Sequence, residues 1–309
     1  MPPAPTPQHQ EARPLYAITL RLLAMLAFSI SFACVKLTTD RGVHLIETAF
    51  YRQLFALPVA LVSVMLGPGL ASLRTSHIGL HASRTAVGAT GMIVNFWAIA
   101  LLPLAEAMTI GFSVPLFATI LAAIFLGERP GIHRWGAVLI GFIGVIVIIN
   151  PGAGSTDMPA FGIGVAITGA ILTSIVSLLL RQIGRTEPPT TTVFYFAALS
   201  LPPLAIAMLF YGQAHDMTSW LLLLLMGIAG GIGQLLITAA LRWGPVSLVL
   251  PMDYSTLLWS TLFGWLLWNN WPGNATWVGA GIIAGSSLYI TWRERVRHRN
   301  MVNRGASVN

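Results

Sequence analysis

The chain has 309 residues, of which 55% are hydrophobic and only 9% are charged. An ordinary soluble domain carries about 25% charged residues, so this composition excludes a soluble protein and predicts a polytopic membrane protein. The formal net charge of +7 would suggest nucleic-acid binding in a soluble chain. Here the basic residues follow the loops between apolar stretches, which indicates membrane topology and no nucleic-acid partner. The single cysteine, Cys34, excludes an intramolecular disulfide.

Ten apolar stretches follow one another, each close to the roughly 20 residues that a helix needs to cross a bilayer core. The polar, proline-rich residues 1–14 precede them and predict a disordered tail. A polar loop at 74–83, a Gly- and Pro-rich linker at 150–155 and a basic tail at 293–309 separate or follow them. We expect the ten helices at residues 15–37, 44–66, 84–101, 105–126, 134–149, 159–180, 190–211, 220–241, 246–268 and 275–292.

A blurred internal repeat divides the chain in two. Residues 269–272 followed by Trp277 reproduce the spacing of residues 127–130 followed by Trp135. Because five is an odd number, two five-helix copies must cross the membrane in opposite directions, and such inverted repeats are typical of secondary transporters. The fold prediction is therefore an all-α polytopic membrane protein with ten transmembrane helices, arranged as 5+5 inverted repeats around a central cavity. The two copies cover residues 15–152 and 153–292.

The distribution of lysine and arginine predicts the orientation. When the N-terminus is placed in the cytoplasm, all but three of the 17 basic residues fall at cytoplasmic ends of the helices. The three exceptions are Lys36, Arg41 and Arg52. An even number of helices then returns the C-terminus to the cytoplasm. We expect a multi-pass protein of the bacterial inner membrane with both termini on the cytoplasmic side.

Ionisable residues inside the apolar stretches are the first candidates for function. Each costs roughly 2.5–3.5 kcal/mol at a helix centre on insertion scales, so it requires a partner or a water-filled cavity. Arg52 and Asp253 lie deepest, and we expect them to contact opposite charges of an amphoteric substrate. The alternative for each is an internal salt bridge, or for Arg52 an extended side chain that reaches the headgroups. Lys36, Glu47 and Glu106 lie nearer the helix ends and are predicted to act in gating or charge pairing.

Uncharged polar and aromatic residues form a second set of candidates. Asn95 and Gln234 occupy nearly equivalent positions in the two repeats, as expected for a substrate site between repeats. Interhelical hydrogen bonds also recruit such residues in membranes, and both interpretations remain open. Phe112 and Tyr254 are candidates for aromatic walls of the substrate site.

Pro115 and Pro251 interrupt apolar stretches in corresponding regions of the two halves. Each removes a backbone hydrogen bond, and the result is either a hinge for alternating access or a kink for packing.

Catalytic patterns are missing from the sequence. All seven histidines fall in tails, loops or helix ends, and no H-E-x-x-H, G-x-S-x-G or P-loop pattern occurs. The sequence therefore predicts neither an enzyme nor a metal or cofactor site.

Several segments resemble the EamA-type families of the drug/metabolite transporter superfamily. They are A-L-L-P-L-A-E-A (100–107), G-E-R-P (127–130), R-W-G-A-V-L-I-G-F-I-G-V (134–145), G-P-V-S-L-V-L-P-M-D-Y (244–254) and W-V-G-A-G-I-I-A-G-S-S-L-Y-I (277–290). The resemblance implies ten helices, inverted repeats, a central cavity and cytoplasmic termini. P-L-A-E-A and R-W-G-A-V are similar to a subgroup that includes S-adenosylmethionine and riboflavin permeases. Two positions depart from the common family pattern: no acidic residue precedes Pro272, and Asp253 stands near Pro251 where apolar residues are commoner.

Together these features predict a secondary transporter that moves a small zwitterionic or heteroaromatic metabolite by alternating access. An exporter of amino acids, other metabolites or drugs with the same fold is the alternative. A membrane-embedded enzyme or a non-transporting assembly partner is the alternative of another class. The sequence leaves open which metabolite is moved, in which direction, with which coupling ion, and whether the protein forms a homodimer.

Overall fold

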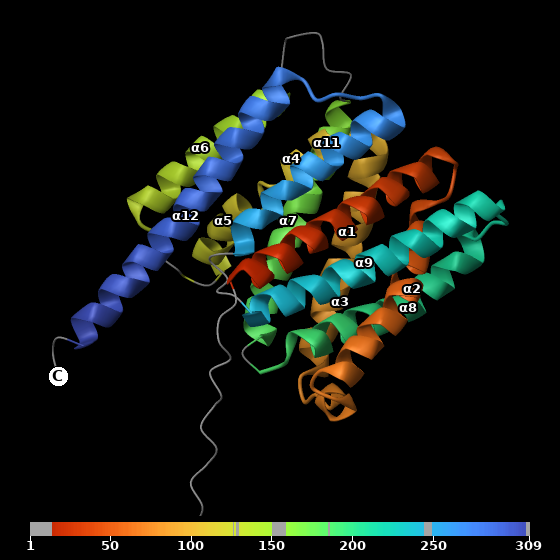
Figure 1. The fold of residues 1–309 in the computed structure, drawn as a ribbon, viewed down its shortest axis with the longest axis horizontal. Helices are drawn as coiled ribbons and strands as arrows, with labels where there is room; N and C mark the ends of the chain where they lie inside the picture. The colour runs from red at the N-terminus through yellow and green to blue at the C-terminus, as the bar shows by residue number, and fades with distance from the viewer. Residues whose placement is uncertain are drawn as a thin grey trace, which may run out of the picture.

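The computed structural model describes residues 14–125, 127, 130–149, 159–184, 186–243 and 249–306. Over these residues the regular structure is helical throughout (Figure 1). The helices are α1 (Pro14–Asp40), α2 (Leu45–Leu66), α3 (Ile78–Leu101), α4 (Leu104–Gly111), α5 (Val114–Phe125), α6 (Ile132–Ile149), α7 (Ala160–Ile183), α8 (Pro189–Tyr211), α9 (Met217–Trp243), α11 (Ser255–Trp268) and α12 (Asn274–Ala306), with the short 3-10 helices η1 (Leu70–Leu73) and η2 (Leu250–Tyr254).

These helices make ten segments that run back and forth through one bundle. α4 and α5 follow each other as one apolar segment, Leu104–Phe125, and η2 continues into α11. Within the described part of the chain, eight segments are long and apolar enough to cross a membrane. The remaining two are η2 with α11, whose α-helical part has 14 residues, and α12, which combines an apolar first half with a basic second half. The predicted all-α polytopic fold is confirmed.

The packing of the helices follows the two-fold relation expected of two inverted five-helix repeats. In that relation α1 corresponds to α7, α3 to α9, α2 to α8 and α6 to α12. α1 packs along α9, and its counterpart pair, α3 with α7, packs in the same way. α2 packs on α8 and α6 on α12, so these helices meet their own counterparts on the axis. The structure thus brings helices of the two halves together at every major contact.

Small residues allow the backbones of α6 and α12 to approach closely. A Cβ atom added to Gly279 would lie 2.6 Å from the carbonyl oxygen of Gly144. Lipid tails are as apolar as leucine, so helices in a membrane gain little from hydrophobic burial against each other and depend on this kind of close contact. The outer face of α6 carries exposed Leu139, Ile140 and Ile143, as a lipid-facing surface should.

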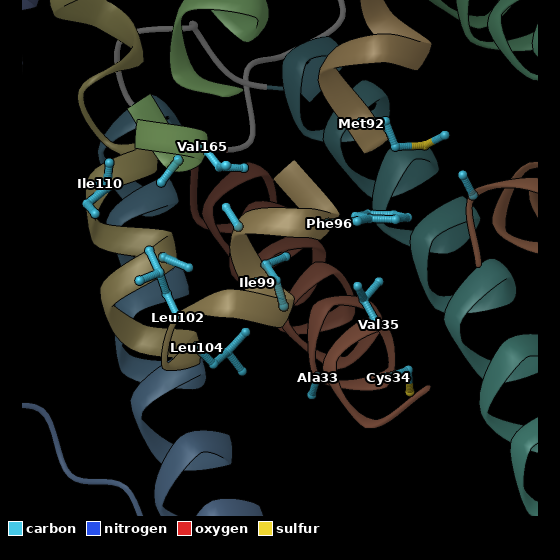
Figure 2. Close-up of a cluster of buried hydrophobic side chains, with 14 of the residues drawn as sticks. Ala33, Cys34, Val35, Met92, Phe96, Ile99, Leu102, Leu104, Ile110 and Val165 are labelled. Carbon is cyan, nitrogen blue, oxygen red and sulfur yellow. The ribbon is translucent and has the colours of Figure 1, made fainter. Parts of the chain in front are cut away.

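A buried apolar cluster fills the junction of α1, α3 and α4 (Figure 2). Phe96, Ile99 and Leu102 come from the end of α3, and Leu104 follows at the start of α4. Val35 of α1 packs into the same cluster. Because these side chains are almost completely buried, they hold the first repeat together at the end of the bundle where α1 ends and α2 begins, which we call the Glu47 end. The opposite end, where α1 begins, is the Arg21 end.

One predicted boundary was wrong, and one helix continues beyond its predicted membrane span. α3 begins at Ile78, so half of the predicted loop 74–83 is helical; the amides of Leu80 and His81 bond to the carbonyl of His77, and the His81 ring stacks on Tyr195 at 4.6 Å. α12 continues through the predicted basic tail to Ala306, because arginine is a good helix former and polarity alone does not end a helix. Residues 1–13 of the predicted tail and the linker 150–155 lie outside the described residues.

Candidate functional site

A small cavity with four polar residues in its lining lies where α2 and α3 of the first repeat face α8 and α9 of the second. Its volume is about 70 Å³. The position agrees with the predicted central cavity, since α2 and α8 meet on the two-fold axis and substrate sites of inverted-repeat transporters lie at the interface between repeats. The lining residues are Arg52, Gln53, Ala56, Ala60, Arg84, Val193, Phe196, Ala197, Gly230, Gly231, Gln234 and Leu235; we call this space the arginine cavity.

Arg52 is held at the edge of the cavity by weak contacts. Its Nη1 donates to Oε1 of Gln53 at 3.0 Å and lies 3.5 Å from Sδ of Met92. Its guanidinium carbon is 5.9 Å from the ring centroid of Phe96. The Nε atom is buried and has no hydrogen-bond acceptor within the described part of the chain. Gly230 of α9 lies beside the group, and a Cβ there would be in ordinary van der Waals contact with it, 3.5 Å from both Nε and Nη2.

Arg84 is the residue that sequence reasoning missed. It is 8% exposed, and its guanidinium carbon lies 3.7 Å from the centroid of the Phe196 ring. Its Nε and Nη1 atoms are buried and have no acceptor among the residues that the structure describes. The sequence analysis counted Arg84 among the basic residues at a helix end because the helix was predicted to begin there. α3 begins at Ile78, six residues or about 9 Å before Arg84. A helix predicted to start there would have placed Arg84 inside the bundle.

Gln53 fixes the polar wall of the arginine cavity. It is 1% exposed, and its Nε2 donates to the hydroxyl of Ser200 at 2.9 Å and to the carbonyl of Phe196 at 3.4 Å. Both partners belong to α8, so the amide also links the two repeats. These bonds orient Oε1 toward Arg52. None of the described carboxylates forms an ion pair with Arg52 or Arg84.

A larger, mainly apolar recess adjoins the arginine cavity. It has a volume of about 720 Å³ and shares Leu235 with the cavity. It lies one helical turn farther along the same helices, toward the Arg21 end: Ser63 follows Ala60 on α2, and Thr238 follows Gln234 on α9. Its lining residues are Ser63, Leu66, Gly67, Pro68, Pro188, Pro189, Thr190, Leu235, Thr238, Ala239 and Trp243.

Asp253 lies outside the arginine cavity. Arg21 of α1 binds it at two points, with Nε 2.5 Å from Oδ1 and Nη2 2.6 Å from Oδ2. The side chain of Arg21 is 6% exposed and that of Asp253 is 35% exposed. Of the two alternatives that the sequence left open for Asp253, the structure has the internal salt bridge. A direct contact with substrate stays a prediction.

The charged residues at the Glu47 end also connect the repeats. Glu47 is fully buried, and its Oε1 lies 2.7 Å from Nε2 of His215 in the loop between α8 and α9. Arg41 pairs with Asp216 in the same loop, Nη2 to Oδ2, at 3.1 Å. Glu47 therefore faces a histidine of the second repeat, and Arg52, although on the same helix, faces the arginine cavity.

Lys36 and Glu106 each contact a helix end. Nζ of Lys36 donates to the carbonyls of Ile99 and Leu102, both at 3.0 Å, where the last carbonyls of α3 lack intrahelical donors. Glu106 in the first turn of α4 is buried, and its Oε1 accepts from the hydroxyl of Thr276 at 3.3 Å. This bond joins α4 to the start of α12. Neither of these contacts joins opposite charges, and a gating or charge-pairing role for either residue stays a prediction.

Asn95 and Gln234 are not brought together. Nδ2 of Asn95 donates to the hydroxyl of Thr173 on α7 at 3.1 Å, and a Cβ at Gly169 would lie 2.6 Å from its Oδ1. Asn95 thus sits in the α3–α7 packing surface as an interhelical hydrogen-bond donor. Gln234 lines the arginine cavity, so only one of the two has the position expected of a substrate contact.

The two predicted hinge prolines coincide with the two interruptions of the helices. Pro115 follows the break between α4 and α5, and Pro251 lies in η2, where the α-helical pattern has not yet begun. Phe112 at the first break and Tyr254 at the second touch edge to face, with ring centroids 5.0 Å apart. The breaks of the two repeats therefore meet each other, and a hinge function of the prolines stays a prediction.

The family model described as the EamA-like transporter family matches residues 15–150 and again 160–292. The chain belongs to the EamA-like transporter family. The two matches cover most of the chain, once in each half. As expected of this family of multi-pass membrane proteins, the apolar helices of this EamA-like protein alternate through one bundle.

This EamA-like protein is similar in sequence to several relatives over nearly the whole length of both chains. It is 29% identical over 293 residues to a riboflavin transporter of Vibrio cholerae, and the alignment covers 94% of this chain and 97% of the relative. It is 26% identical to an S-adenosylmethionine uptake transporter of Rickettsia bellii (89% and 92% covered) and 26% identical to the pseudopaline exporter CntI of Pseudomonas aeruginosa (89% and 95% covered). A solved structure with 22% identity superposes with a TM-score of 0.63 over 90% of this chain and 97% of that one, which shows the shared fold.

Proposed function

We propose that this EamA-like protein is a secondary transporter of the bacterial inner membrane that moves a small zwitterionic or heteroaromatic metabolite by alternating access. The observation that carries the proposal is the arginine cavity, a space at the interface of two inverted repeats that contains two arginines and has a larger recess beside it. The names of the relatives support the size class of the substrate, since riboflavin, S-adenosylmethionine and pseudopaline are all small metabolites.

The distribution of basic residues supports an orientation with both termini in the cytoplasm. The Arg21 end then faces the cytoplasm, and so does the recess beside the arginine cavity. Ion pairs between the repeats occur at both ends: Arg21 with Asp253 at one, and Arg41 with Asp216 at the other. In alternating access the two sets of contacts break in turn, so that the cavity opens to one side at a time.

The test is flux in proteoliposomes that contain the purified protein. Labelled riboflavin, S-adenosylmethionine and a panel of amino acids are supplied with inward and outward gradients. We expect saturable movement of at least one metabolite, strongly reduced in Arg52→Gln and unchanged in Arg74→Gln, which removes an exposed arginine of the loop before α3. Absence of flux for every metabolite in both directions would contradict the proposal. Consumption of a substrate in detergent, where no compartment exists, would favour a membrane-embedded enzyme.

A further inference from the structure

We infer that Arg52 and Arg84 together form an anion site, which holds the carboxylate or phosphate group of the metabolite; the inference rests on the proposed transport function and narrows its substrate class. Of these two arginines, sequence reasoning placed only Arg52 at the substrate. The structure adds a second guanidinium group to the same cavity, contributed by a different helix.

The charges around the cavity are all of one sign. Its lining contains two arginines and neither aspartate nor glutamate. No ion pair with either arginine occurs over the described residues. A buried guanidinium inside a membrane protein normally pairs with a carboxylate or faces a water-filled path, and two like charges in one small space repel each other. Such an arrangement is stabilised when an anion enters between them.

The unused donors suit an oxyanion. Nε of Arg52 and both Nε and Nη1 of Arg84 are buried, and no described residue supplies them with an acceptor. The planar fork of a guanidinium matches two oxygens of a carboxylate or phosphate, which gives short, charge-assisted hydrogen bonds. Phe196 lies 3.7 Å from the Arg84 guanidinium and Gln53 bonds Arg52, so both groups are already positioned before a ligand arrives.

The volumes of the arginine cavity and the recess indicate which part of the ligand each one holds. At about 70 Å³ the arginine cavity admits one carboxylate or phosphate group and not a whole metabolite, because pockets for small molecules measure about 300–1,000 Å³. The recess of about 720 Å³ falls in that range and shares Leu235 with the cavity. The expected substrate therefore has an anionic group for the arginines and an apolar or aromatic body for the recess.

The described lining of the arginine cavity has no carboxylate that could bind a cationic group of the substrate. Asp253, the carboxylate that could have met one, is bound by Arg21 outside the cavity. A zwitterion would be held by its carboxylate, and an anionic compound should bind more tightly than its neutral counterpart.

Thermal unfolding of the purified protein in uncharged detergent tests the site. The probes are glycerol 3-phosphate and inorganic phosphate, with glycerol as the neutral counterpart. We expect Tm to rise with the concentration of both anions and to reach saturation, as for any ligand that binds only the folded state, and not to change with glycerol. Arg84→Gln and Arg52→Gln should abolish the rise, and the exposed control Arg74→Gln should keep it. A rise of equal size in wild type and Arg84→Gln would overturn the anion site.

The ligand-free Tm separates this role from a structural one. Arg84→Gln removes an uncompensated buried charge, so its Tm without anion should be equal to or higher than that of wild type. A structural arginine would give a lower Tm on replacement, and that result, together with anion binding in Arg84→Lys as tight as in wild type, would overturn the proposal. We expect Arg84→Lys to keep the charge, lose the fork and weaken anion binding about tenfold.

An anionic lipid headgroup offers the same chemistry as a soluble phosphate. The unfolding measurement is therefore repeated with phosphatidylglycerol and with phosphatidylcholine added to the detergent. A response to phosphatidylglycerol and none to glycerol 3-phosphate would overturn the assignment to a metabolite.

Flux distinguishes this inference from the proposed function. In proteoliposomes we expect riboflavin 5′-phosphate to compete better than riboflavin for the transported metabolite, and this preference to be lost in Arg84→Gln. Equal transport by wild type and Arg84→Gln would overturn the anion site and leave the transport function intact. Anion binding without flux of any metabolite would overturn the transport function instead.

Discussion

Arg21 and Asp253 are joined by two short contacts across the boundary between the repeats, although they lie 232 residues apart in the chain. The pair ties α1 of the first repeat to η2 of the second. Because the carboxylate is already bound, a substrate that needed Asp253 would first have to displace Arg21. The pair is therefore placed to close the Arg21 end.

Removal of one partner of this pair should cost more than removal of both. Asp253→Asn leaves the guanidinium of Arg21 buried and unpaired, and we expect a loss of about 1–3 kcal/mol, below the 3–5 kcal/mol typical of completely buried pairs, since Asp253 is 35% exposed. Arg21→Gln combined with Asp253→Asn should recover most of that loss. Thermal unfolding of the single and double variants measures it. Additive losses in the double variant would show that the two residues do not depend on each other.

Glu47 and His215 form the corresponding buried contact at the Glu47 end. His215→Gln removes the one basic side chain within 4 Å of Glu47 in the described structure, where the Glu47 side chain is completely buried. We expect a lower Tm, with a cost of about 1–3 kcal/mol for the unsatisfied carboxylate, and a partial recovery in Glu47→Gln combined with His215→Gln.

His77→Gln is the matched control for this prediction, because His77 is an exposed residue of the loop before α3. An unchanged Tm in His215→Gln would contradict the importance of the contact. A drop of the same size in His77→Gln would show that loss of any histidine has this effect.

Gly279 should not tolerate a side chain. A Cβ at this position would lie 2.6 Å from the carbonyl oxygen of Gly144, and backbone cannot move aside as a flexible side chain does. We expect Gly279→Ala to separate α6 from α12 and to lower the stability by about 1–3 kcal/mol, the usual cost of overpacking. Gly281→Ala is the control in the same helix, because a Cβ there meets nothing within 4 Å. Equal Tm values for the two variants would contradict this prediction.

Asp216 should make the stability depend on pH in the acid range. Its Oδ1 accepts from the hydroxyl of Ser219 at 2.5 Å and from the Ser219 amide at 3.2 Å, and Arg41 binds Oδ2. The Ser219 hydroxyl bond is the largest cause, and together these contacts lower the pKa of Asp216 from 3.8 to about 2. Because the folded pKa is the lower one, the stabilisation is complete above about pH 4 and is lost as the pH falls toward 2.

Asp216→Asn provides the comparison for this pH effect, since asparagine also caps helices well but does not titrate. We expect the Tm of wild type to fall more steeply than that of Asp216→Asn when the pH is lowered from 5 to 3. Parallel curves for the two proteins would show that the ionised carboxylate contributes nothing.

The roles of individual polar residues show where sequence reasoning stopped. Asn95 and Gln234 occupy nearly equivalent positions in the two repeats, yet one bonds Thr173 on α7 and the other lines the arginine cavity. The difference comes from what each helix packs against, because Gly169 lets α7 approach Asn95 closely. Arg84 was missed because its helix starts six residues earlier than the hydropathy of the loop predicts.

The sequence by itself determined the membrane class, the ten helical segments and the inverted pairing of the two halves. Apolar length, charge spacing and an odd number of helices per repeat are properties of consecutive residues, so they can be read without coordinates. Only the tertiary structure decided that Arg21 binds Asp253 and that Arg52 and Arg84 line the same cavity. Both arrangements depend on how helix faces rotate and pack against each other, which the order of residues along the chain does not give.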